Sequence, residues 1–167
     1  MTEAAPLWKK PAGLARGTKA AAAPRAESPE YLGFLLGSTQ YGLPLVAVRE
    51  ILKPPPITTV PRTASDILGV CSLRGRVITV FDVRVRLRAE PSTTSRQSRI
   101  IVIDDGDETK GLWVDRVLQV YRMKPEEIEP GSAAGSHVAP HVVGIARPHE
   151  GGLLLLLDPR ATFRRSR

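Results

Sequence analysis

The 167-residue sequence predicts an all-β protein built from two small barrels that pack on one another. Short runs of β-branched and aromatic residues alternate with turn-forming residues along most of the chain, which is typical of strands. One pattern in the first part of this series recurs in the second part. Each copy holds about five short strands, too few for a stable core of its own, so the two units are expected to share a core.

Strands are predicted where apolar residues cluster or alternate with polar ones. In chain order they are residues 31–36, 41–45, 46–52, 70–73, 77–81, 99–103, 111–121, 142–146 and 153–157. Turns are predicted at residues 37–40, 74–76, 104–107 and 149–152, where glycine and polar residues gather. Single helical turns are predicted after Ser65-Asp66, ending near Leu68, and after Asp158, because serine and aspartate cap helices. Loops are expected at residues 91–95 and 131–140.

The hairpin over residues 70–81 is the most distinctive local feature. Its two strands flank Arg74-Gly75-Arg76, where Gly75 can adopt positive φ. The second strand is almost wholly apolar, which predicts burial between two layers. Asp82 ends that strand as a turn former or as a helix N-cap. Arg74 at the bend is expected to project its planar guanidinium into solvent or towards a partner.

An internal repeat supports the division into two units. The matching segments are Gly42 to Ile51 with Gly111 to Val120, Gly69-Val70 with Gly144-Ile145, and Val80 to Arg84 with Leu156 to Arg160. Because the matches keep their order along the chain, the two units are expected to have equivalent strands, with a groove between them.

The net charge of +7 lies mainly at the chain ends. Residues 1–29 carry a net +3 and residues 164–167 another +3, which leaves +1 for the rest. We therefore predict a disordered basic tail over 1–29, a folded domain over 30–163 and a basic tail over 164–167. Terminal charge is more typical of solvated tails than of a binding face. A basic small-barrel nucleic-acid-binding protein is therefore only the alternative hypothesis.

The sequence predicts no catalytic site and no cofactor. Asp82 and Asp158 follow apolar strands at equivalent repeat positions, which favours turns or caps over a catalytic carboxylate pair. Three histidines, His137, His141 and His149, do not predict a zinc site. Pro140 opposes the helix that would align the first two, and no Cys, Asp or Glu motif completes a set of ligands.

Cysteine use and hydropathy favour the cytoplasm. Cys71 is the single cysteine, so no intramolecular disulfide can form, and its apolar strand predicts a core residue. The longest apolar run, residues 153–157, is far too short to cross a membrane, and no signal peptide is expected.

A series of short motifs runs through the predicted domain. They are Tyr31-Leu32-x-Phe34-x-Leu36, Tyr41-Gly42-Leu43, Val48-Arg49-Glu50-Ile51, Gly69-Val70, Leu73-Arg74-Gly75, Val80-Phe81-Asp82-Val83-Arg84, Gly111-Leu112-x-Val114-Asp115-x-Val117 and Leu156-Leu157-Asp158. Together and in this order they resemble the CheW family, scaffold proteins of bacterial chemotaxis arrays. The resemblance implies two intertwined five-stranded SH3-like barrels, no catalysis, and an adaptor that joins chemoreceptor tips to a CheA-type histidine kinase.

The resemblance also implies a surface that faces the receptor. Its residues would be Leu45, Val48, Glu50, Leu73, Arg74, Gly75, Val114 and Val117. A receptor tip is a helical hairpin, which suits an apolar groove with a charged rim. Glu50 and Arg74 would lie on neighbouring strands and pair with each other or with partner charges. The aliphatic residues could instead be core, and Glu50 could simply be a charge on an edge strand.

Overall fold

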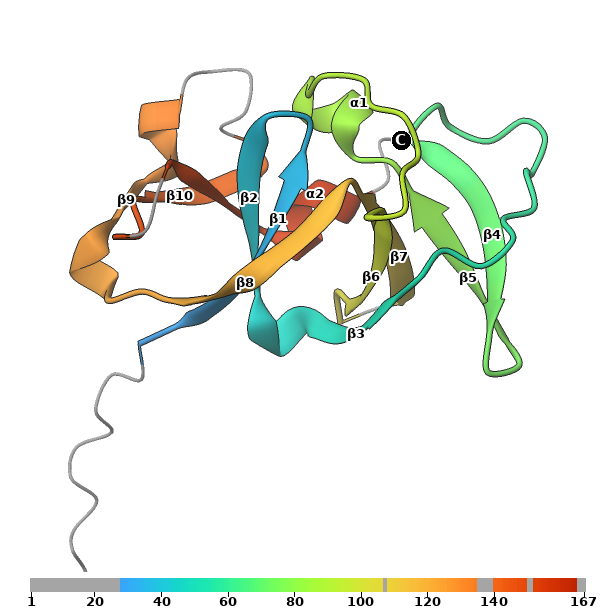
Figure 1. Cartoon of the computed structure of the whole chain (residues 1–167), viewed down its shortest axis with the longest axis horizontal. Coiled ribbons are helices and arrows are strands. Elements are labelled where there is room, and N and C mark those ends of the chain that lie inside the picture. Colours follow the sequence, from blue (N-terminus) through green and yellow to red (C-terminus); the bar gives the residue numbers. More distant parts are fainter. Residues whose placement is uncertain (1–27, 107, 135–139, 150–151, 165–167) are drawn as a thin grey trace, which may run out of the picture.

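The computed structural model describes residues 28–106, 108–134, 140–149 and 152–164. Most of the predicted N-terminal tail and residues 165–167 lie outside this part of the chain. The described residues form two strongly twisted sheets with a few short helical turns (Figure 1). The prediction of an all-β fold is therefore confirmed.

The first sheet has six strands in the order β8-β1-β2-β11-β10-β9. Their bounds are β1 Glu30–Leu36, β2 Thr39–Pro44, β8 Arg116–Arg122, β9 Ile128–Pro130, β10 Val142–Ala146 and β11 Leu154–Leu157. The second sheet has five strands in the order β3-β6-β7-β5-β4. Their bounds are β3 Val48–Leu52, β4 Ile67–Leu73, β5 Arg76–Phe81, β6 Arg99–Asp104 and β7 Thr109–Val114.

Short helices connect or follow the strands. They are η2 Leu45–Ala47, α1 Arg84–Leu87, η3 Pro125–Glu127, η4 Gly131–Ala134 and α2 Pro159–Phe163. Asp158 caps α2 by accepting a hydrogen bond from the backbone N–H of Arg160, as predicted. The helices are too short to form a layer of their own, so the sheets supply the architecture.

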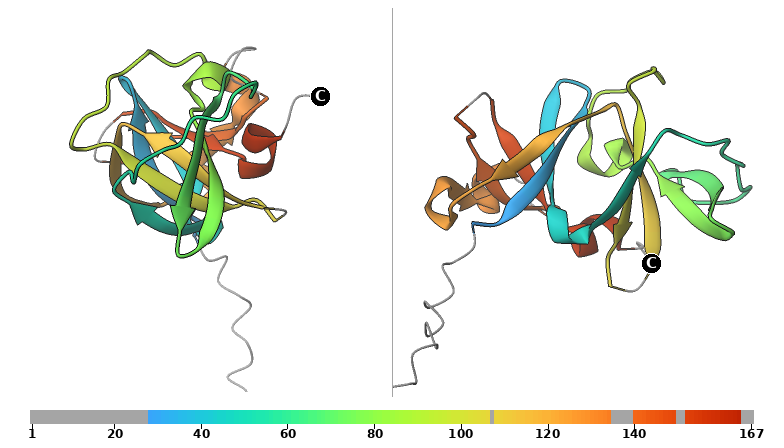
Figure 2. Two further views of the ribbon diagram at one scale, coloured as in Figure 1. Left: turned by 90° about the vertical axis from the view of Figure 1, so that its right-hand side faces the viewer. Right: turned by 60° about the horizontal axis from the view of Figure 1, so that its bottom comes forward.

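The two sheets exchange strands at two crossovers. The chain leaves the six-stranded sheet after β2, passes through η2 and enters the five-stranded sheet as β3. It crosses back between β7 and β8, at Asp115. Each half of the repeat therefore contributes strands to both sheets, which makes the two units intertwined (Figure 2).

Strand pairing confirms the internal repeat. β11 runs parallel to β2 with Leu156 opposite Gly42, and β5 runs parallel to β7 with Val80 opposite Gly111. In the sequence repeat, Gly42 corresponds to Gly111 and Val80 corresponds to Leu156, so the two pairings are equivalent. The halves differ in one respect, because β9 adds a sixth strand beside β10, whereas beside β4 only an isolated bridge between Thr58 and Val70 forms.

Three apolar clusters make the core. The largest lies between the sheets and includes the fully buried Phe34, Leu112 and Leu157. A smaller cluster, with Ile78 and Val102, belongs to the five-stranded sheet, and its members are Cys71, Ile78, Val80, Ile100, Val102 and Trp113. A third belongs to the six-stranded sheet and is made of Met123, Ala146, Leu154 and Leu156. The groove expected between the two units is therefore filled by a shared core, against which Leu45, Val48 and Val117 are packed half-buried.

Two strand predictions need correction at the crossovers. Residues 45–47, expected to be extended, form the helical turn η2. The predicted single strand over residues 111–121 is broken at Asp115, and its two parts belong to different sheets. Hydrophobic alternation did not reveal these breaks because the residues on both sides remain apolar.

The predicted helical turn after Asp66 is wrong. Residues 67 and 68 begin β4, and the buried Asp66 carboxylate pairs with Arg86 instead of capping a helix. Gly69 adopts φ of 147°, and a β-carbon there would stand 2.3 Å from the carbonyl oxygen of Thr58. A glycine is therefore required here, because the backbone of Thr58 passes so close to β4.

The other corrections are local. Val77 is 73% exposed, so the second hairpin strand is buried only over its later residues. Residues 131–134 of the predicted loop form η4, whereas residues 135–139 are outside the described part. The predicted turn over 149–152 is described only at its two ends.

Cys71 is buried and unpaired, as its apolar strand predicted. Among the described residues, no group of three or more His, Cys, Asp or Glu side chains is close enough to bind a metal ion. His137 lies outside the described residues. No helix among the described residues is long and apolar enough to cross a membrane.

Candidate functional site

Glu50 and Arg74 meet where the two edges of the five-stranded sheet approach each other. β3 and β4 are the two edges of this sheet, with three strands between them. The Arg74 guanidinium, in the turn after β4, nevertheless donates to the Glu50 carboxylate at 3.0 Å. The predicted pair therefore forms, but the expectation that its residues lie on neighbouring strands is wrong, because curling of the sheet brings its edges together.

The turn between β4 and β5 presents Arg74 by its backbone conformation. Arg74 and Gly75 have φ of 50° and 77°, the left-handed pair typical of a tight hairpin turn. Nothing stands within 4 Å of where a β-carbon on Gly75 would be, so this glycine serves the turn and not a close packing contact. The Arg74 side chain is 80% exposed, which leaves its remaining donors available to a partner.

An open hollow of 570 Å³ lies beside this ion pair. Its walls combine charged side chains with apolar ones from the small core of the five-stranded sheet. They are Arg49, Glu50, Leu73, Arg74, Arg76, Ile78, Val102, Asp104 and Thr109. Three of the four predicted residues of this region, Glu50, Leu73 and Arg74, line the hollow, and Gly75 forms the adjoining turn.

The charges around the hollow are only partly paired. Arg49 forms an ion pair with Asp104 on the neighbouring β6, and Glu50 pairs with Arg74. The hydrogen bond from Arg49, helped by the backbone N–H of Gly106, lowers the pKa of Asp104. The side chain of Arg76 makes no hydrogen bond or ion pair with any described residue. The rim therefore offers one unpaired cation and suits an acidic group on a partner.

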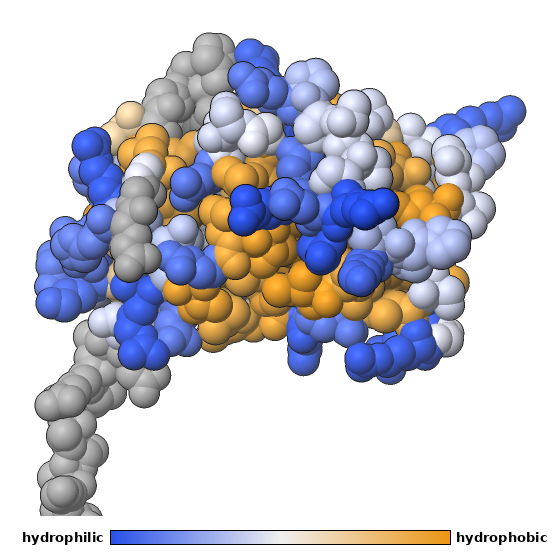
Figure 3. Space-filling model, in the orientation of Figure 1, coloured by the Kyte–Doolittle hydropathy of each residue, from blue (hydrophilic) through white to orange (hydrophobic). Residues whose placement is uncertain are grey.

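A second surface follows the edge of the shared core. We define the junction strip as Leu45, Val46, Val48, Val117 and Val120, which come from η2, β3 and β8. Leu45, Val48 and Val117 are half-buried against the shared core, whereas Val46 and Val120 are 97% and 46% exposed. Figure 3 shows apolar side chains gathered over the centre of this face, where β8 crosses in front, and below it near η2.

A bulge in β3 connects the strip to the hollow. Val48 lies opposite Ile103, which belongs to the shared core, whereas Glu50 lies opposite Val102, which belongs to the smaller core. The register shifts between Val48 and Glu50, which allows one short strand to present an apolar side chain to the strip and a carboxylate to the hollow. The two surfaces are therefore continuous along β3.

Val114 does not belong to either surface. Its side chain has no accessible area and packs in the shared core, so it supports the strip from below and cannot touch a partner in this structure. The predicted residues thus separate into Glu50, Leu73, Arg74 and Gly75 at the hollow and Leu45, Val48 and Val117 at the strip.

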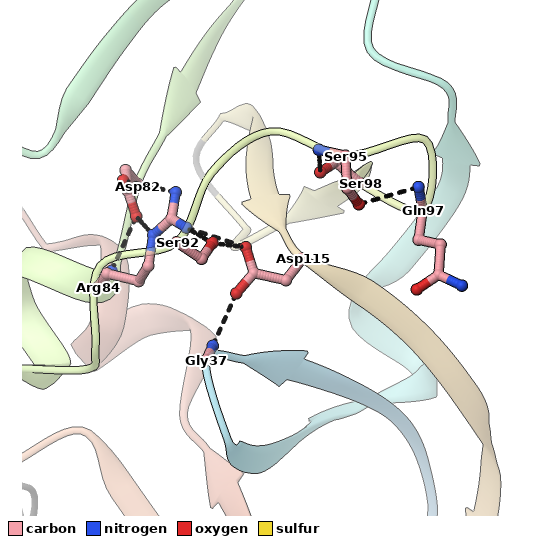
Figure 4. A network of polar contacts seen from close by, with 8 residues as sticks. All are labelled: Gly37, Asp82, Arg84, Ser92, Ser95, Gln97, Ser98 and Asp115. Carbon is pink, nitrogen blue, oxygen red and sulfur yellow. Dashed lines mark hydrogen bonds and ion pairs between the residues drawn. The ribbon is translucent and has the colours of Figure 1, made fainter.

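A polar network holds the β7–β8 crossover (Figure 4). Arg84 donates to both carboxylate oxygens of Asp82, at 2.8 and 2.9 Å, and to Asp115 at 2.9 Å. Asp115 also accepts from the backbone N–H of Gly37 at 2.6 Å, and Ser92 contacts both Arg84 and Asp115. The hydrogen bond to Asp82 raises the pKa of Arg84, which favours the charged guanidinium.

Comparison with known proteins gives the family. The profile of the CheW-like domain matches residues 30–167, most of the chain. This chain belongs to the CheW family. The chemotaxis protein CheW of Helicobacter pylori is 31% identical over 101 residues, 60% of this chain and 61% of that protein, so the match spans less than two thirds of it. The CheW of Klebsiella aerogenes is 32% identical over 119 residues, 71% of this chain and 70% of that protein.

A solved CheW structure has the same architecture. The crystal structure of the scaffolding protein TtCheW from Thermoanaerobacter tengcongensis superposes with a TM-score of 0.76 at 29% identity. The match covers 83% of this chain and 94% of the other. The predicted family and its duplicated fold are therefore confirmed for this CheW-family chain.

Sequence reasoning missed several residues of this CheW-family surface and of the β7–β8 crossover. The sequence predicts Val46 in a strand, but it lies in the helical turn η2 with its side chain exposed to solvent. Arg76 follows the hairpin glycine and was treated only as a turn residue. Arg84 and Asp115 appeared in the family motifs without a role, because 31 residues separate them and only the fold brings them together.

Proposed function

We propose that this chain is a non-enzymatic adaptor that couples the cytoplasmic tips of chemoreceptors to a CheA-type histidine kinase in the cytoplasm. The observation that carries the proposal is the continuity of the junction strip with the hollow along β3. Leu45 and Val48 from the first half of the repeat and Val117 from the second pack against the same shared core, which supports a partner surface that draws on both halves. Its CheW-family membership supports a role in chemotactic signalling.

The junction strip suits a helical partner. Its aliphatic residues come from the edge strands β3 and β8 and from η2, and Val46 and Val120 remain open to solvent. An amphipathic helix that packs along such a strip buries its apolar stripe against these side chains. The receptor tip, a helical hairpin, is therefore proposed to contact Leu45, Val48 and Val117, with Val46 and Val120 added by the structure.

The hollow is proposed to set specificity. Arg74 keeps donors free beside its bond to Glu50, and the Arg76 guanidinium has no partner among the described residues. A partner carboxylate near these two guanidinium groups gains charge-assisted hydrogen bonds, whereas a basic partner is repelled. We assign Glu50 a second role, that of holding Arg74 in place before the partner arrives.

The proposal is tested with a purified receptor-tip fragment and the regulatory domain of a CheA-type kinase, each titrated alone and then together. The parent protein is expected to bind both and to form a ternary complex. Arg74→Glu should weaken receptor binding about tenfold or more, because it opposes like charges at the rim. The matched control is Arg62→Glu, which makes the same charge change at an exposed arginine outside both surfaces.

Three outcomes would contradict the adaptor role. The first is a parent protein that binds neither fragment. The second is an equal loss of binding in Arg62→Glu, which would assign the effect to net charge alone. The third is salt-sensitive retention of nucleic acid that disappears when residues 1–29 and 164–167 are removed, which would favour the nucleic-acid alternative.

A further inference from the structure

The β7–β8 crossover is held by contacts to both sheets. The backbone N–H of Asp115 donates to the carbonyl of Leu35 at 3.1 Å, and its carboxylate accepts from the N–H of Gly37 at 2.6 Å. Both partners belong to the β1–β2 hairpin of the six-stranded sheet. Asp115 therefore fixes the start of β8 on that hairpin through its backbone and its side chain together.

Arg84 extends this attachment to the other sheet. Its guanidinium binds Asp115 on one side and both oxygens of Asp82 on the other, and Asp82 directly follows β5 of the five-stranded sheet. The side chains of Arg84, Asp82 and Asp115 are 10%, 16% and 16% exposed. Such shielded pairs are screened less by water and salt than rim pairs, so this contact holds its geometry more firmly.

The internal repeat provides a comparison within the same molecule. Asp115 corresponds to Val46 at the β2–β3 crossover, and Arg84 corresponds to Arg160. Val46 is 97% exposed, and the Arg160 guanidinium has no hydrogen-bond or ion-pair partner in the described part of the chain. A guanidinium nitrogen of Arg160 still lies 3.2 Å from where a β-carbon on Gly106 would stand. The equivalent of Asp115 is missing from this copy, and Asp158, the equivalent of Asp82, accepts from the backbone N–H of Arg160.

The fold can therefore make this crossover without the network. One copy is locked by Asp82, Arg84 and Asp115, which we call the Arg84 clamp, and the other is left open. The locked copy leads directly into β8, which carries Val117 and Val120 of the junction strip, and the open copy leads into β3, which carries Val48. The asymmetry points to a role in placing one half of the partner surface.

We propose that the Arg84 clamp is a positioning device, which fixes the six-stranded sheet relative to the five-stranded sheet and so places the β8 half of the junction strip against the β3 half. Arg84 and Asp115 touch no partner themselves and act through β8. The claim about sheet positions stands on the contacts alone, whereas its consequence for binding rests on the proposed adaptor function.

Distance measurement between the sheets tests the clamp without any partner. Spin labels are attached to cysteines placed at Val77 of β5 and Val143 of β10, exposed residues on different sheets, with Cys71 replaced by alanine. Pulsed electron paramagnetic resonance then gives the distribution of distances between the labels. The parent and the matched control Arg160→Met are expected to give one narrow distribution.

Arg84→Met should broaden that distribution or add a second distance, because the side chain keeps its apolar part and loses the guanidinium that binds Asp82 and Asp115. Arg84→Lys should give an intermediate result, since one ammonium can reach one carboxylate but not hold both. Asp115→Asn is the second variant if Arg84→Met fails to fold. It keeps an oxygen acceptor for Gly37 and loses the charge that faces Arg84. A narrow, unchanged distribution in the folded variants, with only a lower melting temperature, would overturn the proposal.

Titration of the same variants with the receptor-tip fragment separates the two claims. Arg84→Met is expected to weaken binding about tenfold while Arg160→Met leaves it unchanged. If the parent itself does not bind, the adaptor function fails, and the distance data still decide the clamp. If the distances broaden and affinity does not change, the clamp does not place the partner surface, and that part of the proposal is overturned.

Discussion

Glu50 and Arg74 meet at 3.0 Å although β3, which carries Glu50, and β4, which ends just before Arg74, are opposite edges of one five-stranded sheet. Their ion pair therefore marks the seam where the sheet closes into a barrel. The hollow and the bulge of β3 lie at this seam, so the ion pair places charge beside an apolar surface. This arrangement predicts different consequences for stability and for partner binding.

Loss of the seam pair should cost little stability. Because the Arg74 side chain is 80% exposed, Arg74→Ala is expected to lower the free energy of unfolding by less than about 1 kcal/mol, as is usual for surface ion pairs. The same variant should bind the receptor-tip fragment more weakly. Urea unfolding followed by tryptophan fluorescence measures the first quantity. A loss of several kcal/mol would show that the pair is structural.

Val114 and Val120 should behave in opposite ways. Val114→Ala removes two buried methyl groups from the shared core, and we expect it to lower the free energy of unfolding by about 2 kcal/mol. Val120→Ala, at a residue 46% exposed, should cost less than about 1 kcal/mol and yet reduce partner binding. Urea unfolding and titration calorimetry check both. The reverse order of stabilities would contradict the separation of strip from core.

The Cys71 thiol should be unreactive in the native protein. Burial raises the pKa of Cys71, so the native state favours the protonated thiol. This contributes stability that is fully present below the unfolded pKa of about 8.5 and is lost as the pH rises through the higher folded value. Alkylation by iodoacetamide should be slow in native buffer and fast in urea. Rapid native labelling at neutral pH would contradict this assignment.

The Arg49–Asp104 pair should shape the acid side of the stability curve. The hydrogen bond from Arg49 lowers the pKa of Asp104, so the pair stabilises the fold above the usual aspartate pKa of about 3.9. That contribution disappears as the pH falls through the depressed folded value. Nuclear magnetic resonance titration of the Asp104 carboxyl should give a higher pKa in Arg49→Gln than in the parent. An unchanged value would exclude Arg49 as the cause.

Much of the fold follows from local sequence patterns. The β4–β5 hairpin is predictable because Gly75 allows the turn and β-branched residues flank it, and the Asp158 cap is predictable from its place before Pro159. The repeat identified the equivalent strands, since Gly42 and Gly111 occupy the same places in the two sheets.

The exchange of strands between sheets could not be predicted in the same way. At Asp115 the apolar pattern continues while the chain changes sheets, so periodicity gives no signal of the crossover. The pairing of Glu50 with Arg74 was expected, but its geometry depends on the curl of the whole sheet. The burial of Val114 and the exposure of Val46 likewise depend on which strand edge each residue meets, a property of tertiary structure.

The junction strip is the central claim, and methyl resonances report on it directly. The measurement is the chemical-shift change of valine methyl groups when the receptor-tip fragment is added to the labelled protein. The account predicts large changes at Val46, Val48, Val117 and Val120, and none at Val143, an exposed valine on the distant β10. Changes confined to Val143 or spread evenly over all valines, with the strip methyls no more affected than the rest, would contradict it.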